Sequence, residues 1–294
     1  RPRSCGASPR TTKALGTIGQ SSDNAMVPLA LPAPLSIAEP LSWIIVIGFL
    51  VAALLEYYGK EQARPIAVAT WVLFGAFWLV LVPHFVFEQK SIVEGVGSIL
   101  AVPLSIYAGY LLWNGRDTLF FLTRAVAIMG LIYLPFSYLP FIADNPARRI
   151  LIESVAMQTD FLLGLIDVEP ELVRGVDVRS DALDNPDYQY LSTFFFDREG
   201  VNVIYTIIIA CTGLGAMAIF AGAILAVRAP IDRKLKALGI AIPIIYGANL
   251  FRNVFIATMY GEQRMQWFVG PITTLFGAEE PKVSYYIADR LLAQ

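Results

Sequence analysis

Cys211 and Arg252 are the residues of this chain whose types and surroundings could support covalent chemistry. Each lies inside a long apolar run, Cys211 in residues 201–227 and Arg252 in residues 237–260. A cysteine thiolate is a strong nucleophile, and a nearby cation lowers the pKa of the thiol. A guanidinium beside the sulfur could also hold the negative oxygen that forms when a nucleophile adds to a carbonyl. If the two side chains meet, they could carry out acyl transfer.

Six apolar segments must position these residues, and their lengths predict membrane-spanning helices. A span needs about 20 mostly apolar residues. The segments are residues 40–58, 66–87, 91–113, 119–139, 201–227 and 237–260. Only 16% of the chain is charged, whereas soluble domains carry about a quarter. We therefore expect an all-α, polytopic transmembrane helical bundle of about six to seven spans. The net charge of -2 gives no reason to expect a nucleic-acid partner.

Basic residues between the last two segments predict the orientation, because cytoplasmic loops are rich in lysine and arginine. The cluster consists of Arg228, Arg233, Lys234 and Lys236. If this loop is cytoplasmic, Cys211 lies about 15 Å along its helix from the outer end at about 1.5 Å per residue. Arg252 then lies about 12 Å from the outer end of the antiparallel helix. Both residues are predicted at similar depth in the outer half of the membrane.

The non-membrane parts of the chain are predicted at its start and in its middle. Residues 1–25 are polar, basic and poor in acids, so we expect a disordered or non-native extension. Residues 26–294 would form a single transmembrane domain. The long connection 140–200 is expected outside the cell, with an amphipathic helix on the membrane at 147–166 and an acidic surface loop at 167–200.

Alternative interpretations exist for both central residues. Arg252 has Asn249 and Asn253 beside it, which makes a polar patch, but it could also be a snorkelling or structural arginine. Cys211 could be a packing residue, because it begins a stripe of small residues that suits helix–helix contact. The stripe consists of Cys211, Gly215, Ala218, Gly222 and Ala226.

Other titratable residues narrow the chemistry. The chain has one histidine, His84, and two cysteines, Cys5 and Cys211, which argues against a Cys/His metal site and a disulfide framework. We expect no metal or organic cofactor. His84 fits an interfacial or packing role, or that of a distant proton carrier. Arg290 lies in a helical pattern that starts near Pro281, and it is either a surface arginine or a third cation at the site.

Three short motifs, in this order and spacing, resemble the exosortase/archaeosortase family. They are Ala210-Cys211-Thr212-Gly213, Asn249-Leu250-Phe251-Arg252-Asn253 and Asp289-Arg290. The resemblance covers most of residues 40–294. It implies a membrane-embedded cysteine transpeptidase in which Cys211 forms a thioester, Arg252 stabilises the thiolate and oxyanion, and Arg290 fills a third catalytic position. Thr212, Asn249 and Asn253 would support these residues.

The resemblance also implies the partners and the location. The substrates would be secreted surface proteins, such as an S-layer glycoprotein, with a C-terminal tail. That tail holds a Pro-Gly-Phe-type motif, a transmembrane helix and a basic cluster. The acceptor would be a membrane lipid. The enzyme would span the cell membrane with its active site on the extracytoplasmic side.

Three other functions remain open at this point. A multi-span transporter could bind an anionic substrate through Arg252, but it should show internal repeats and broken helices, which are not evident. A purely hydrolytic intramembrane thiol protease would use the same residues, because hydrolysis and transfer share a thioester. A structural membrane subunit would leave an arginine in an apolar run beside a cysteine unexplained.

Overall fold

Long apolar helices make up most of the described structure. The computed structural model describes residues 34–88, 91–137, 146–179, 185–198, 201–266, 269–276 and 282–292. Among these residues, five helices are long and apolar enough to cross a membrane. They include α1 (Pro34–Tyr57), α2 (Ala63–Pro83), α3 (Ile92–Trp113), α4 (Phe120–Ser137) and α8 (Ile231–Gly261). The predicted polytopic helical bundle is confirmed, and these helices match five of the six expected spans.

The remaining elements are shorter, and several of them surround the candidate residues. The helices are α5 (Pro146–Gly164), α6 (Gly175–Val178), α7 (Leu214–Ala226), α9 (Val269–Phe276) and α10 (Val283–Tyr285). The short 3-10 and π-helical segments are η1 (His84–Glu88), η2 (Asp117–Leu119), η3 (Pro186–Gln189), η4 (Ile209–Thr212) and η6 (Tyr286–Leu292). The strands are β1 (Glu171–Arg174), β2 (Leu191–Arg198) and β3 (Val201–Thr206).

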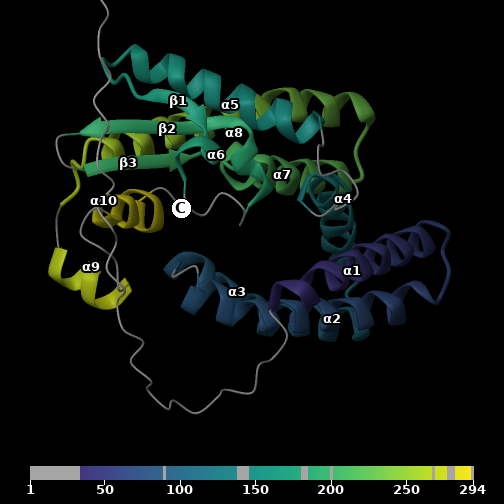
Figure 1. Ribbon diagram of the computed structural model, residues 1–294. Coiled ribbons are helices and arrows are strands. Elements are labelled where there is room, and N and C mark those ends of the chain that lie inside the picture. The colour runs from purple at the N-terminus through teal and green to yellow at the C-terminus, as the bar shows by residue number, and fades with distance from the viewer. Residues whose placement is uncertain are drawn as a thin grey trace, which may run out of the picture. The chain divides into compact units, whose positions relative to one another are not determined.

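The first four helices pack through a shared apolar core. Helix α2 lies between α1 and α3, and α1 also contacts α4. Phe49 and Leu112 are fully buried in this core. Trp71 packs edge-on against Phe49 and donates from Nε1 to Thr123 Oγ1 at 3.0 Å, which satisfies its buried polar atom. From α4 the packing continues to α7 and then to α8, both near the candidate site (Figure 1).

The predicted span at residues 201–227 is wrong. This segment begins as the strand β3, turns through η4 and continues as α7, which has only 13 residues. At about 1.5 Å per residue α7 is about 20 Å long, short of the roughly 30 Å of a bilayer core. The misassignment has a physical cause: the run Val201–Ala210 is rich in β-branched residues, and a short apolar run does not distinguish a strand from a helix.

The predicted surface loop at 167–200 is also wrong, because it contains the strands β1 and β2. They form a three-stranded antiparallel sheet with β3, in the order β1-β2-β3. Phe194 of β2 lies opposite Tyr205 of β3, and their rings stack with centroids 6.2 Å apart. Thr193 and Thr206, the next pair along, share a hydrogen bond of 3.0 Å between their hydroxyls. Such cross-strand pairs are the stabilising units of a sheet.

Helix α5 confirms the helix expected at residues 147–166. Its inner face is covered by protein, since Ile152, Val155 and Leu163 are fully buried in a core shared with the sheet and α8. In Figure 1, α5 runs along the sheet above β1. The predicted contact of α5 with the membrane stays a prediction. The expected extension at residues 1–25 lies outside the described residues.

Candidate functional site

Cys211 lies in the turn η4, outside the five long apolar helices. Ile208 has extended backbone angles, and the Cys211 amide donates to the Ile208 carbonyl at 2.8 Å. Thr212 closes the turn through its hydroxyl, which donates to the Ile209 carbonyl at 2.7 Å and accepts from the Leu214 amide at 3.4 Å. The supporting role that the sequence predicts for Thr212 is therefore a local one: its side chain satisfies backbone groups of the turn.

Gly213 gives the turn its direction. Its φ of 76° lies in the left-handed region, which costs other L-residues about 1–2 kcal/mol. A Cβ at this position would also lie 2.9 Å from the side chain of Asn249. The glycine thus lets the chain leave η4 and begin α7 while α8 stays in close contact.

Asn249 and Asn253 hold the backbone of Cys211 from α8. Their side-chain amides lie one helical turn apart and both donate to the Cys211 carbonyl, at 2.8 Å and 2.9 Å. Asn253 is fully buried, and the Tyr205 hydroxyl donates to its Oδ1 at 3.4 Å. A carbonyl with two donors is fixed in position, so these two asparagines fix the nucleophile candidate against α8.

Arg252 lies between the two asparagines on the same helix. Its guanidinium lines the same cavity as the Cys211 thiol, and its positive charge lowers the pKa of that thiol. Its Nη2 also forms an ion pair with Asp289 Oδ1 at 2.6 Å. The side chains of Arg252 and Asp289 are 27% and 9% exposed, so water screens this pair only in part. The structure thus brings together the two residues that the sequence singled out, although a turn and not a helix carries the cysteine.

The surroundings of Cys211 act on its acidity in opposite directions. Burial is the largest effect and raises the pKa of the thiol above its ordinary value. The backbone hydrogen bond and the positive charge of Arg252 lower the pKa, whereas the negative charge of Asp289 raises it. The net pKa is raised, so the sulfur is a protonated thiol at neutral pH until a partner or a substrate removes the proton.

Both side chains line one cavity of about 360 Å³, a size common for small-molecule sites. Five tyrosines contribute to its wall, namely Tyr188, Tyr205, Tyr260, Tyr285 and Tyr286. Its charged residues are Glu94, Arg179, Arg252, Lys282 and Asp289. These residues come from α3, from the sheet region, from α8 and from the C-terminal turns. A carbonyl group that enters this cavity can approach the sulfur and the guanidinium at the same time.

Arg290 and Asp289 occupy η6, the C-terminal helical turn, which confirms the helical pattern expected after Pro281. The structure describes the backbone of Arg290 but not its side chain, so the third catalytic position stays a prediction. Asp289 was missed as a site residue. The signal was present: an acidic residue in an apolar stretch needs a cation, and Arg252 is the cation in the other motif.

His84 is not among the residues that line the cavity. It lies in η1 and packs edge-on against Phe85, with ring centroids 5.5 Å apart. Cys5 lies outside the described residues. Within the described part of the chain, no group of three or more His, Cys, Asp or Glu side chains could hold a metal ion.

Comparison with known proteins gives consistent matches over most of the chain. The family model for the transmembrane exosortase matches residues 38–278. Archaeosortase A from Haloferax volcanii is 44% identical over 264 residues, which cover 88% of this chain and 84% of that protein. Archaeosortase A from Natronomonas pharaonis is 39% identical over 260 residues, which cover 87% and 78% of the two chains. No solved structure matches this sequence.

Proposed function

This chain belongs to the transmembrane exosortase family, and we propose that it is a cysteine transpeptidase embedded in the cell membrane. Family membership confirms the resemblance predicted from three short motifs, and it identifies the chain as a multi-pass membrane protein and a processing enzyme. The thioester mechanism, the substrates and the acceptor below are parts of the proposal.

The placement of the Cys211 thiol and the Arg252 guanidinium in the wall of one cavity is the observation that carries this proposal. In the first step, the sulfur of Cys211 adds to the scissile carbonyl after loss of its proton. Arg252 stabilises the oxyanion that forms on the carbonyl oxygen. The carbon–nitrogen bond then breaks, the amine of the tail leaves with a proton, and a thioester to Cys211 remains. An acceptor nucleophile then adds to the thioester carbonyl, the carbon–sulfur bond breaks, and the proton that the acceptor loses returns to the sulfur, which regenerates the Cys211 thiol.

The other predicted site residues have roles that follow from their positions. Asn249 and Asn253 hold the Cys211 backbone, and Thr212 closes the turn. Arg290 would act as the third catalytic residue and stands next to Asp289, the ion-pair partner of Arg252. The ion pair with Asp289 holds the Arg252 guanidinium in place, which suits a group that stabilises an oxyanion in the cavity. It argues against the transport of an anion through Arg252, because the guanidinium already has a counter-ion.

The substrates in this proposal are secreted surface proteins with a C-terminal sorting tail of the Pro-Gly-Phe type, such as an S-layer glycoprotein. The hydrophobic part of the tail would lie in the bilayer beside α8, which confines the cleavage motif near the site and supplies proximity. The acceptor would be a membrane lipid, so that the product is a lipid-anchored protein. The site would face the extracytoplasmic side, where secreted proteins arrive.

The test compares Cys211→Ala, Cys211→Ser and the wild type in archaeal cells that lack their own enzyme. A surface protein with such a tail is followed by gel mobility and by lipid labelling. We expect the wild type to remove the tail and attach lipid, and both variants to leave the tail intact. Tail removal without lipid would favour a hydrolytic thiol protease. Normal processing by Cys211→Ala would contradict the proposal and redirect attention to transport through Arg252.

A further inference from the structure

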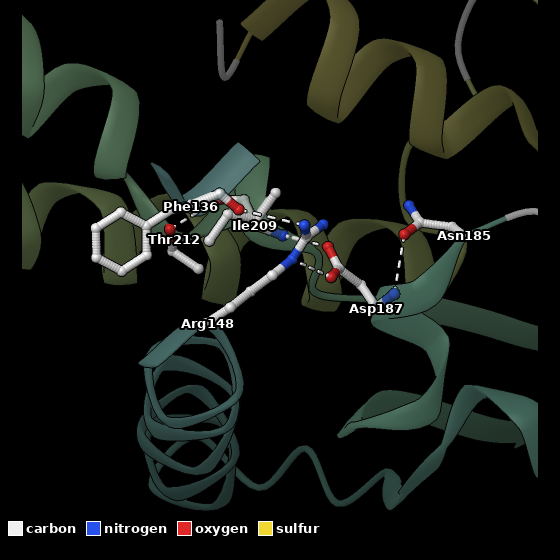
Figure 2. A network of polar contacts seen from close by, with 6 residues as sticks. All are labelled: Phe136, Arg148, Asn185, Asp187, Ile209 and Thr212. Carbon is white, nitrogen blue, oxygen red and sulfur yellow. Dashed lines mark hydrogen bonds and ion pairs between the residues drawn. The ribbon is translucent and has the colours of Figure 1, made fainter. Parts of the chain in front are cut away.

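The cysteine turn also contacts an ion pair whose carboxylate, that of Asp187, is fully buried. The Asp187 side chain has no exposed surface, and its Oδ1 accepts from Arg148 Nε at 2.7 Å (Figure 2). Arg148 comes from the start of α5, and its Nη1 also donates to the Phe136 carbonyl at the end of α4, at 3.2 Å. The Asp187 amide donates to Asn185 Oδ1 at 2.9 Å. Through Arg148, the Asp187 carboxylate thus links the connection before β2 to both α5 and α4.

The second oxygen of the same carboxylate contacts the cysteine turn itself. Asp187 Oδ2 accepts from the backbone amide of Ile209 at 2.9 Å, and Ile209 is the first residue of η4. Ile208, which precedes it, provides no side-chain cap. Amides at the start of a helical turn have no partner within the turn, and a buried one without a partner is costly. Asp187 therefore supplies from outside the acceptor that the local sequence lacks.

The two contacts fix the turn at two points. Asp187 holds the Ile209 amide at its start, and Asn249 and Asn253 hold the Cys211 carbonyl two residues later. A rigid turn of this kind sets the direction of the sulfur toward Arg252. Reacting groups must be aligned closely, and a misplacement of about 1 Å can lower a rate by about a hundredfold.

We propose that Asp187 is a positioning residue for Cys211, and that Arg148 acts by holding the Asp187 carboxylate in place. This inference rests on the proposed function of Cys211. It makes the junction of α4, α5 and η3 part of the catalytic apparatus, although none of these side chains touches the substrate.

The decisive comparison uses two double variants that remove both charges and differ in whether position 187 carries a hydrogen-bond acceptor. Arg148→Met/Asp187→Asn keeps an oxygen acceptor for the Ile209 amide, whereas Arg148→Met/Asp187→Leu has the same shape and no acceptor. Apolar replacement of a whole buried ion pair is often tolerated, so both proteins should fold. Each full-length variant is placed in archaeal-lipid liposomes with a synthetic tail peptide, and kcat, KM and the unfolding midpoint are measured.

We expect the two double variants to share the same KM and to stay folded in the assay, with a lower unfolding midpoint for the Leu variant because its Ile209 amide has no acceptor. We expect kcat of the Leu variant to be lower than that of the Asn variant by about tenfold or more. Arg149→Ala is the matched control on the neighbouring, exposed arginine, and it should keep the wild-type kcat. If the Leu variant does not fold, Asp187→Asn and Asp187→Ala give the same comparison with Arg148 intact.

Equal kcat values within a folded pair would overturn the inference and leave Asp187 with a structural role only. The experiment also separates this result from failure of the proposed function. If Cys211→Ala still processes the peptide, the proposed function is lost whatever the Asp187 variants do. If Cys211 is required and the paired variants have equal kcat, only the positioning inference is lost.

Discussion

At the scale of single residues, two opposite charges in one cavity act on the Cys211 thiol. Arg252 lines the cavity beside Cys211 and forms an ion pair with Asp289. The ion pair orients the guanidinium. Arg252 lowers the pKa of the thiol and Asp289 raises it, so the two charges act on the sulfur in opposite directions. A thiol that stays protonated until substrate enters is protected from oxidation and stray alkylation, since the thiolate is the reactive form.

The first prediction concerns the pH dependence of Cys211 alkylation by iodoacetamide, measured in a Cys5→Ala background. Asp289→Asn removes a negative charge that raises the pKa of the thiol, so the pKa falls and the rate profile shifts to lower pH. Arg252→Ala removes a charge that lowers the pKa, so its profile shifts to higher pH. Arg252→Lys keeps the charge and serves as the control. Shifts of both variants in the same direction would contradict this account.

At the scale of elements, the turn η4 and the glycine that follows it connect the sheet to α7. The conformation of the turn is stabilised from outside as well as by Thr212. Asn249 of α8 donates to the Cys211 carbonyl, and Gly213 adopts a φ of 76° in close contact with Asn249. The catalytic geometry therefore depends on a close approach between α8 and the turn. A side chain at position 213 would separate them.

We predict that Gly213→Ala destabilises the protein by about 1–2 kcal/mol from backbone strain alone. Contact with Asn249 should weaken the hold on the Cys211 carbonyl, so that kcat falls as well. Gly239→Ala, at a position in α8 with open space around it, should keep both the unfolding midpoint and kcat. Thermal unfolding in detergent and peptide processing measure the two effects. Equal behaviour of the two variants would show that the close approach is not required.

Helix α5 has a second apolar face on its outer side. Large side chains are more than half exposed there, namely Ile150 at 64%, Met157 at 60% and Phe161 at 67%, and Leu165, directly after the helix, is 66% exposed. Their spacing places them on one stripe of the helix. In a membrane protein such a stripe fits contact with lipid, as the amphipathic pattern of residues 147–166 predicts.

A fluorescent probe at position 161 of α5 should be quenched by brominated lipid acyl chains. The probe is attached to Phe161→Cys in a background of Cys5→Ala and Cys211→Ala, and the matched control is Glu171→Cys on the exposed end of β1. We expect strong quenching at position 161 and little at position 171, because the apolar stripe lies in the bilayer. Equal, weak quenching at both positions would place α5 in water.

At the scale of the whole molecule, the candidate site and a second group of ion pairs, around Glu56, consist of different residues. The cavity is built by α3, the sheet region, α8 and the C-terminal turns. A separate group of ion pairs centres on Glu56 of α1, which contacts Arg124 of α4 at 2.9 Å and also pairs with Arg228. The Glu56 and Arg124 side chains are 17% and 21% exposed, so this charge pair joins two spans in a setting with little water.

Glu56→Gln should lower stability with little effect on chemistry. It leaves Arg124 without its counter-ion, which costs about 1–3 kcal/mol for a buried hydrogen-bonded group. Asp117→Asn is the control, since the Arg64–Asp117 pair is 44% and 65% exposed and exposed pairs contribute about 0–1 kcal/mol. Unfolding in detergent measures stability, and kcat of the folded protein should stay unchanged in both. A large loss of kcat in Glu56→Gln would couple the two regions.

The sequence predicted the long spans and the proximity of Cys211 to Arg252, but it predicted the proximity for an incorrect reason. Apolar length identifies spans such as α2 and α8, because lipid imposes a fixed thickness. The same criterion failed at residues 201–210, where the neighbouring strand β2 decides the conformation. The contact of Asp187 with the Ile209 amide joins residues 22 positions apart, and local pattern carries no record of it. For Asp289, the apolar stretch around it indicated the need for a cation, but the pairing with Arg252 comes from the folded structure.

The central claim is that Cys211 carries the substrate as a thioester, and mass spectrometry of the protein during turnover tests it most directly. The enzyme is mixed with a tail peptide, quenched in acid and digested. We predict that the peptide containing Cys211 gains the mass of the substrate up to the cleaved bond, that hydroxylamine removes this mass, and that Cys211→Ala shows neither the adduct nor cleavage. Cleavage at a normal rate by Cys211→Ala, or an adduct on another residue, would contradict the account.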